Sequence, residues 1–131
     1  MQPNTAMRVA RPTDNLALIR EMYTKGLGLR VLAEFVDHQG FDGVILGHSQ
    51  HLYHIEFTTR RGHTAGIAPG KDHLLVFYIP DGREWEESCV RMITAGFQQY
   101  PSENPYWDVK GKTFEDPDGY RVVLNNEAWT K

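Results

Sequence analysis

Two side chains that can exchange protons, His54 and Glu56, stand two positions apart in a segment with the pattern of a β-strand. Tyr53, Ile55 and Phe57 alternate with them, and alternation along a strand sends neighbouring side chains to opposite faces of a sheet. The apolar residues would pack beneath a helix, which leaves His54 and Glu56 together on the other face. A histidine and a carboxylate placed in this way can act as catalytic acid and base, or can orient a polar ligand.

Arg121 is the third candidate, because a faint internal repeat brings residues 121–123 to the place of residues 54–56, 67 positions earlier. Its guanidinium could hold a carboxylate, a phosphate or another acceptor. Glu56 and Arg121 are expected to pair, either around a ligand or as a structural ion pair between the two halves. For His54 the alternatives are a general base or ligand-orienting group, and a histidine satisfied at the rim of the site.

The two leading strands add further lining to the same side. Strand alternation and the 67-residue offset together place six side chains of these strands on one face: Met7, Val9 and Arg11 with Leu74, Val76 and Tyr78. The sequence therefore predicts a mostly apolar bowl that carries Arg11 and Tyr78 beside the first three candidates. An apolar lining with a few converging polar groups is typical of a small-molecule pocket.

A pair of adjacent aromatic residues, Tyr106 and Trp107, follows the turn Asn104-Pro105. Such a pair could form a wall on which a planar ligand stacks. The alternative is that Trp107 covers a sheet edge or a dimer contact. Both readings stay open at this level.

The elements that must position these residues are read from periodicity, caps and turns. A strand at 7–11 precedes a helix capped by Thr13 or Asp14 and stopped at Gly26 and Gly28. Strands are expected at 29–37, 44–46 and 52–58, and residues 59–72 form a linker. The second half repeats this order: a strand at 73–79, a helix from an Asp81 cap to Gly96, a weakly marked strand, a loop at 101–110, and strands at 112–116 and 120–125. The prediction is an α+β fold of two strand–helix–strand–strand–strand modules, about 5–59 and 72–127, within one domain spanning 1–131.

Composition limits the function further. The chain has 131 residues, a net charge of −3 and 24% charged residues, with no basic stripe, so nucleic acid is not an expected partner. No apolar run reaches the ~18 residues of a membrane span, and no signal peptide is evident. The single cysteine, Cys89, fits a reducing compartment, so a cytoplasmic location is expected.

Several motifs together resemble the glyoxalase/bleomycin-resistance/extradiol-dioxygenase (vicinal oxygen chelate) superfamily. They are Met22-Tyr23 before Gly26-Leu27-Gly28-Leu29, the hairpin Asp116-Pro117-Asp118-Gly119 with the strand after it, and the duplication itself. The resemblance implies curved mixed sheets of two βαβββ modules that enclose a concave cavity, and a homodimer. Metal-dependent members carry ligands on the first and fourth strand of each module, which the 67-residue offset maps to Met7, Glu56, Leu74 and Val123. Only Glu56 could bind a hard ion, so no metal or other cofactor is expected.

The expected function is binding of a small polar or planar molecule, by sequestration or with metal-independent activity. The alternative is a divalent-metal-dependent lyase, isomerase or dioxygenase of the same superfamily that uses Glu56. A structural or regulatory partner protein is a third class, supported only by the exposed aromatic residues. Whether the chain is an enzyme, and which ligand it takes, are left open by the sequence.

Overall fold

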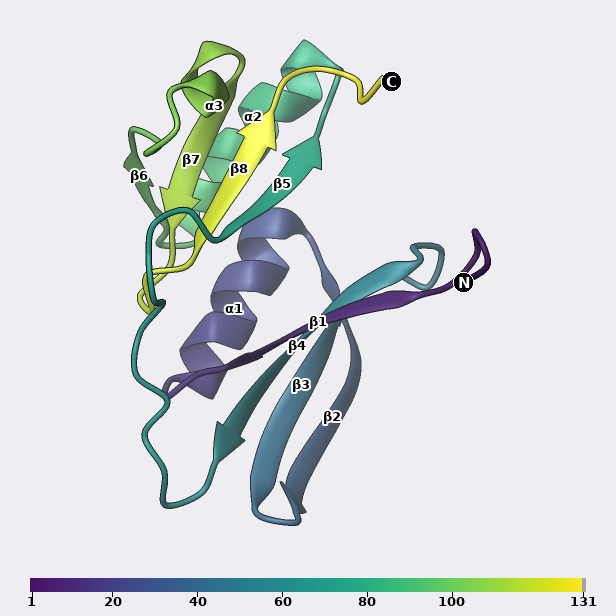
Figure 1. Ribbon diagram of the computed structural model, residues 1–131, viewed down its shortest axis with the longest axis vertical. Helices are drawn as coiled ribbons and strands as arrows, with labels where there is room; N and C mark the ends of the chain where they lie inside the picture. The colour runs from purple at the N-terminus through teal and green to yellow at the C-terminus, as the bar shows by residue number, and fades with distance from the viewer. Residues whose placement is uncertain (131) are drawn as a thin grey trace. The chain divides into compact units, whose positions relative to one another are not determined.

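A computed structural model describes residues 1–130. The chain divides into two compact units (Figure 1), an N-terminal unit of Met1–Thr24 with Gly28–Gly66, and a C-terminal unit of Lys25–Leu27 with the chain from Ile67 onward. Each unit holds one mixed, open, four-stranded sheet. The predicted α+β fold with two βαβββ modules is confirmed.

The N-terminal unit contains β1 (Met7–Pro12), all but the last three residues of α1 (Leu16–Leu27), β2 (Arg30–His38), β3 (Phe41–Gly47) and β4 (Tyr53–Arg60). Its sheet has the order β1-β4-β3-β2, with β1 parallel to β4 and the other pairs antiparallel. One face packs against α1, where the rings of Tyr23 and Phe57 lie 4.8 Å apart and both residues are buried. Their burial fixes which face of β4 is turned away from the helix.

The C-terminal unit contains β5 (Leu74–Tyr78), α2 (Gly82–Thr94), β6 (Gln98–Tyr100), α3 (Tyr106–Val109), β7 (Gly111–Glu115) and β8 (Arg121–Asn125). The sheet order is β5-β8-β7-β6, with β5 parallel to β8. Figure 1 shows α2 behind this sheet, and the indole of Trp85 on α2 donates to the Leu124 carbonyl of β8 at 2.8 Å. The weakly marked strand is real but only three residues long, and the predicted loop at 101–110 contains the short helix α3.

The helix caps correct one expectation. Asp81 caps α2, with its side chain accepting from the Glu84 N–H at 3.0 Å. The α1 helix begins after Asn15, not after Thr13 or Asp14, and no side chain caps it. Asp14 instead accepts the N–H groups of Ala65 and Gly66 at 2.8 and 3.1 Å, which ties the end of the first unit back to the connection between β1 and α1. Because the cap positions are Asn15 and Asp81, the two halves are offset by 66 residues at this point.

This offset changes the register of β1. The ladder pairs Arg8 with His54 on β4 and Leu74 with Arg121 on β8. With the fourth strands aligned at the predicted 67 residues, the first strands therefore correspond at 66. A shift of one residue turns a strand's side chains to the opposite face. Met7, Val9 and Arg11 consequently lie on the α1 face, and the prediction that they line the opposite face is wrong.

Arg11 shows the consequence most clearly. It pairs with Phe57, is 8% exposed, and shares the face of the buried Phe57 and Ile55. Arg8, which pairs with His54, occupies the position on the opposite face that was predicted for Arg11.

The closing hairpin is the turn that the sequence indicated. Asp116 Oδ1 accepts the N–H groups of Asp118 at 2.8 Å and Tyr120 at 3.1 Å, and Gly119 adopts a φ of 87°. A glycine tolerates this left-handed conformation without steric cost. The turn therefore sets the register of β7 against β8.

Candidate functional site

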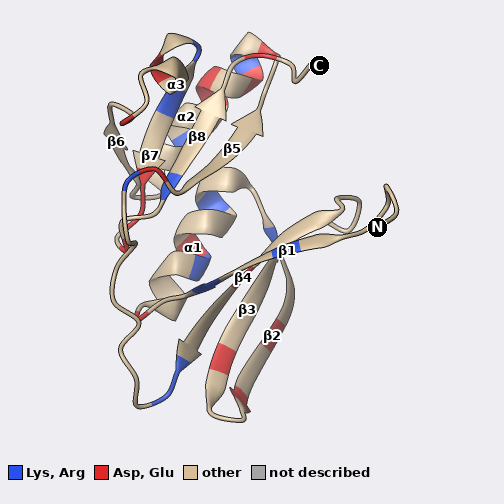
Figure 2. Ribbon diagram, viewed as in Figure 1, with Lys and Arg blue, Asp and Glu red and all other residues tan. Residues whose placement is uncertain are grey.

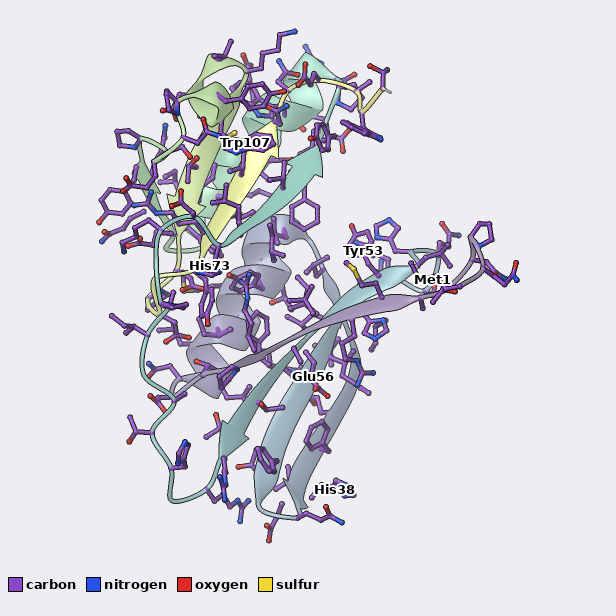
Figure 3. All side chains as sticks on the ribbon, in the orientation of Figure 1. Met1, His38, Tyr53, Glu56, His73 and Trp107 are labelled. Carbon is purple, nitrogen blue, oxygen red and sulfur yellow. The ribbon has the colours of Figure 1, made fainter. Side chains whose placement is uncertain are left out.

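The N-terminal unit has a compact polar cluster on the sheet face opposite α1, which we call the Arg8 cluster: Arg8, His54 and Glu56. Arg8 Nε donates to His54 Nε2 at 2.9 Å, and Arg8 Nη1 lies 3.4 Å from Glu56 Oε2. Strands β1 and β4 position all three, because their parallel register sets Arg8 beside His54 and Ala10 beside Glu56. Figure 3 labels Glu56 on this part of the sheet. The predicted association of His54 with Glu56 on one face holds in this geometry, with Arg8 between them.

The hydrogen bonds define the chemical state of the cluster. His54 accepts at Nε2, which requires the neutral ring with its proton on Nδ1. The Glu56 side chain is 17% exposed and that of Arg8 is 44% exposed. The guanidinium is thus held by two partners and still reaches solvent, an arrangement suited to an incoming acceptor group.

Apolar side chains surround this cluster on the same face. Ile45 of β3 pairs with Glu56, and Ala33 of β2 pairs with Ile45. The Phe35 ring lies so close to Gly43 that a Cβ there would stand 2.2 Å from the ring. A glycine at position 43 therefore lets an aromatic ring lie flat across β3. The face places the Arg8 guanidinium beside apolar surface, a combination that suits a small amphiphilic anion.

The C-terminal unit holds Arg121 in a second cluster, the Lys71–Glu115–Arg121 cluster. Glu115 Oε1 accepts from Lys71 Nζ at 2.6 Å and from Arg121 Nε at 3.1 Å. Arg121 and Glu56 do not form the pair predicted from the sequence, because Arg121 pairs with Glu115 and Glu56 pairs with Arg8, each within its own unit. Sequence reasoning missed Lys71 and Glu115, because Lys71 lies in a loop and Glu115 is paired with Arg121 only through the β7–β8 hairpin.

The remaining candidates lie elsewhere in the C-terminal unit. Tyr78 shares the face of Arg121 through its pairing with Asn125, and its ring is 5.8 Å from that of Trp129. Tyr106 and Trp107 both lie on α3, with ring centres 4.9 Å apart and an edge-to-face angle of 85°. Figure 3 labels Trp107. The structure gives Tyr106 and Trp107 mutual contact, and their role as a ligand wall stays a prediction.

A cavity of about 540 Å³ lies at the connection between β6 and β7 in the C-terminal unit. Its lining comes from both strand ends and α3: Gln99, Tyr100, Pro101, Asp108, Gly111, Lys112 and Thr113. None of the residues chosen from the sequence lines this cavity. The signal that could have found it is the loop 101–110 itself, since long connections that are not disordered often carry function.

The metal-ligand positions of the superfamily do not fit a metal in this chain. With the corrected register, these positions hold Arg8 and Glu56 in the N-terminal unit, and Leu74 and Val123 in the C-terminal unit. Leucine and valine have no donor atoms, and a guanidinium is a cation that repels a metal ion. Within residues 1–130, no group of three or more His, Cys, Asp or Glu side chains is arranged to hold a metal ion.

Charge and hydropathy are unremarkable outside these clusters. Figure 2 shows basic and acidic residues interspersed over both units. No helix in the described part of the chain is long and apolar enough to cross a membrane.

Cys89 is buried on α2, and this burial raises the pKa of its thiol, so it resembles a packing residue more than a nucleophile.

The pKa of Glu115 leads to a prediction on stability. Burial alone would raise this pKa, but the hydrogen bonds from Lys71 and Arg121 outweigh burial and hold it below its usual value of 4.5. A carboxyl whose folded pKa is lowered contributes stability above the unfolded pKa and loses it as the pH falls through the folded pKa. We therefore expect the melting temperature of Glu115→Gln to fall less steeply than that of the wild type as the pH drops below 4.5. Thermal melts over a pH series measure this, and Glu103→Gln, at an exposed position, should keep the wild-type slope. Equal slopes for both variants would contradict the assignment.

The chain has two βαβββ modules, and in each the first and fourth strands form a parallel pair within a four-stranded sheet. This architecture is that of the vicinal oxygen chelate superfamily. Residues 7–58 match the YycE-like N-terminal domain and residues 72–126 match the YycE-like C-terminal domain. The chain belongs to the YycE-like family.

A curated relative agrees with this assignment. The uncharacterized protein YycE of Bacillus subtilis is 43% identical over 120 residues, which cover 92% of this chain and 86% of that protein. A solved structure of a Bacillus subtilis YycE protein of unknown function, described as a candidate glyoxalase/fosfomycin resistance protein, is 42% identical with a TM-score of 0.89. That comparison covers 98% of this chain and 93% of the other.

More distant structures share the fold alone. The fosfomycin resistance protein FosX of Mesorhizobium loti has a TM-score of 0.74 at 10% identity, covering 98% of this chain and 94% of its own. The trypanothione-dependent glyoxalase I of Leishmania major has a TM-score of 0.70 at 19% identity, covering 92% and 84%. One architecture in this superfamily thus carries different activities, so function must be argued from the site.

Proposed function

We propose that the protein binds a small organic anion on the Arg8 cluster, by sequestration or with metal-independent activity. The observation that carries this proposal is the guanidinium of Arg8, held between His54 and Glu56 and still 44% exposed. Charge-assisted hydrogen bonds to a guanidinium are stronger than neutral ones, so Arg8 is the anchor for the ligand's charged group.

The surroundings suggest the rest of the ligand. Ile45 and the Phe35 ring give apolar surface on the face that carries the charge. A planar apolar body next to a carboxylate would use both features. Tyr78, Arg121, Tyr106 and Trp107 remain proposed ligand-binding residues of the C-terminal unit by itself, apart from the Arg8 cluster.

Glu56 and His54 are the proposed catalytic residues if the protein acts chemically on its ligand. The Glu56 carboxylate is largely buried, and its contact with Arg8 is long at 3.4 Å. A carboxylate held this loosely can accept a proton from a bound molecule, with Arg8 stabilising the negative charge that develops. This activity requires no group beyond the chain's own residues.

We propose further that the protein is cytoplasmic and homodimeric. One buried, unpaired cysteine is compatible with a reducing compartment. Sedimentation velocity tests the dimer, and a purely monomeric species at micromolar concentration would refute it.

Metal content separates this proposal from a metal-dependent activity. We expect purified protein to hold no stoichiometric Ni, Zn, Fe or Mn, because Arg8, Leu74 and Val123 occupy three of the four ligand positions. Elemental analysis is the measurement. About one tightly held transition metal per chain, lost in Glu56→Gln, would refute the expectation.

Benzoate tests the proposed anchor, with benzamide as a neutral ligand of the same shape. We expect calorimetry to show binding of benzoate that weakens about tenfold in Arg8→Gln, which corresponds to about 1.4 kcal/mol. Benzamide should bind weakly and equally to both proteins. Arg60→Gln, at an exposed arginine at the end of β4, is the matched control and should bind benzoate as the wild type does. Equal benzoate affinity in Arg8→Gln and wild type would refute the proposal.

A further inference from the structure

We infer that the Lys71–Glu115–Arg121 cluster is a second binding site, for a tetrahedral oxyanion such as a phosphate group. It lies in the C-terminal unit and does not depend on the proposed function of the Arg8 cluster. The inference starts from the balance of charge. Two cations share one carboxylate oxygen, Glu115 Oε1, at 2.6 Å from Lys71 Nζ and 3.1 Å from Arg121 Nε. The cluster therefore carries one positive charge in excess.

Burial makes that excess costly. The Arg121 side chain is 6% exposed and that of Glu115 is 16% exposed, while Lys71 is 46% exposed. A buried charge that is incompletely compensated is unfavourable, so an added anion lowers the free energy of the folded state. Lys71 gives the cluster an accessible side through which an anion can approach.

The cationic groups are already in position. Arg121 Nη1 donates to the Pro101 carbonyl at 3.3 Å, and the guanidinium carbon lies 5.3 Å from the centre of the Tyr100 ring. Arg121 Nη2 makes no hydrogen bond to any of the described residues. The loop that carries Lys71 is fixed to the closing hairpin by the bond from the Ala68 N–H to the Asp118 carbonyl, 2.7 Å. A fixed site loses little entropy when a ligand binds.

An independent observation comes from Thr113. This residue is fully buried, and its Oγ1 has no hydrogen-bond partner in the described chain. It lies two residues from Glu115 on β7 and so shares the face of Arg121, which pairs with Glu115. A buried hydroxyl without a partner costs about 1–3 kcal/mol, and an oxygen-rich ligand beside it would remove that cost.

The combination selects the ligand class. An ammonium, a guanidinium N–H and a hydroxyl from three separate places suit an acceptor with oxygens in several directions. A phosphate group has that geometry, whereas a planar carboxylate does not.

Inorganic phosphate is the probe, measured by calorimetry and thermal shift against chloride at equal ionic strength. We expect phosphate to bind and raise the melting temperature of the wild type. Lys71→Gln should weaken binding about tenfold. Lys110→Gln is the matched control, because Lys110 is also in an ion pair, with Glu127 at 3.4 Å, but is 60% exposed and outside the cluster.

Two further variants separate a binding role from a structural one. Glu115→Gln removes the competing carboxylate, so it should bind phosphate more tightly than the wild type although it is less stable. Thr113→Val should be more stable than the wild type without phosphate, because it removes the unpaired hydroxyl, and should bind phosphate less tightly. A purely structural cluster would leave phosphate affinity unchanged in both.

The two sites are distinguished by Arg8→Gln, which should bind phosphate as the wild type does. The inference is overturned if wild type fails to bind phosphate, if Lys71→Gln and Lys110→Gln bind it equally, or if Arg8→Gln is the variant that loses it.

Discussion

Arg121→Ala is expected to destabilise the protein by about 3–5 kcal/mol, the range for removing one partner of a buried ion pair. The change removes the bond to Glu115, the bond to the Pro101 carbonyl and the contact with the Tyr100 ring. Glu115 keeps Lys71, which is half exposed and compensates its charge only in part. Chemical denaturation of wild type and variant measures the loss.

The double change Arg121→Ala with Glu115→Ala identifies the cause. It removes the buried carboxylate along with its partner, so it should be more stable than Arg121→Ala alone. Arg83→Ala, at an exposed position on α2, should stay within about 0.5 kcal/mol of the wild type. A loss below about 1 kcal/mol for Arg121→Ala would contradict the view that this pair is a buried interaction.

Gly111→Ala is expected to destabilise by about 1–3 kcal/mol, because it places an atom where the backbone leaves no room. A Cβ at this position would stand 2.6 Å from the Trp107 carbonyl oxygen, 2.9 Å from Asn125 Oδ1 and 3.2 Å from the Leu124 carbonyl oxygen. Two of these are backbone atoms that cannot rotate away. The end of α3 would have to move off β7, and the fluorescence of Trp107 should report that movement.

Gly82→Ala is the matched control for this change. A Cβ at residue 82, the first of α2, meets nothing within 4 Å. Alanine there restricts the unfolded chain and should stabilise by about 0.4–1 kcal/mol. If Gly111→Ala and Gly82→Ala change the free energy of unfolding in the same direction, the close approach of atoms at Gly111 does not determine the effect of substitution there.

The sequence was sufficient for the elements that local chemistry defines. Asp81 caps α2 and Gly28 ends α1 with a φ of 69°, as their residue types require. Asp116 forms the hairpin turn through its side chain, and the period-two pattern of β4 correctly separated Ile55 from Glu56. Each of these features depends on residues within a few positions of one another.

The register between distant strands could not be obtained in this way. Aligning Asp14 with Asp81 gives 67 residues, but the residue equivalent to Asp81 is Asn15, whose side chain caps nothing. Because of this one-residue difference in offset, Arg11 lies on the buried face and Arg8 lies beside His54. The partners of Arg121 were missed for a related reason, since the contact with Lys71 depends on how a loop folds back.

Benzoate binding followed by amide chemical shifts is the most direct test of the proposed function. In a titration of the wild type monitored by heteronuclear NMR, the largest changes should fall on Arg8, His54 and Glu56 and on their neighbours in β1 and β4. The same changes should be nearly absent in Arg8→Gln and present in Arg60→Gln. Shifts confined to Tyr106–Val109, or shifts that persist unchanged in Arg8→Gln, would contradict the assignment of the ligand to the Arg8 cluster.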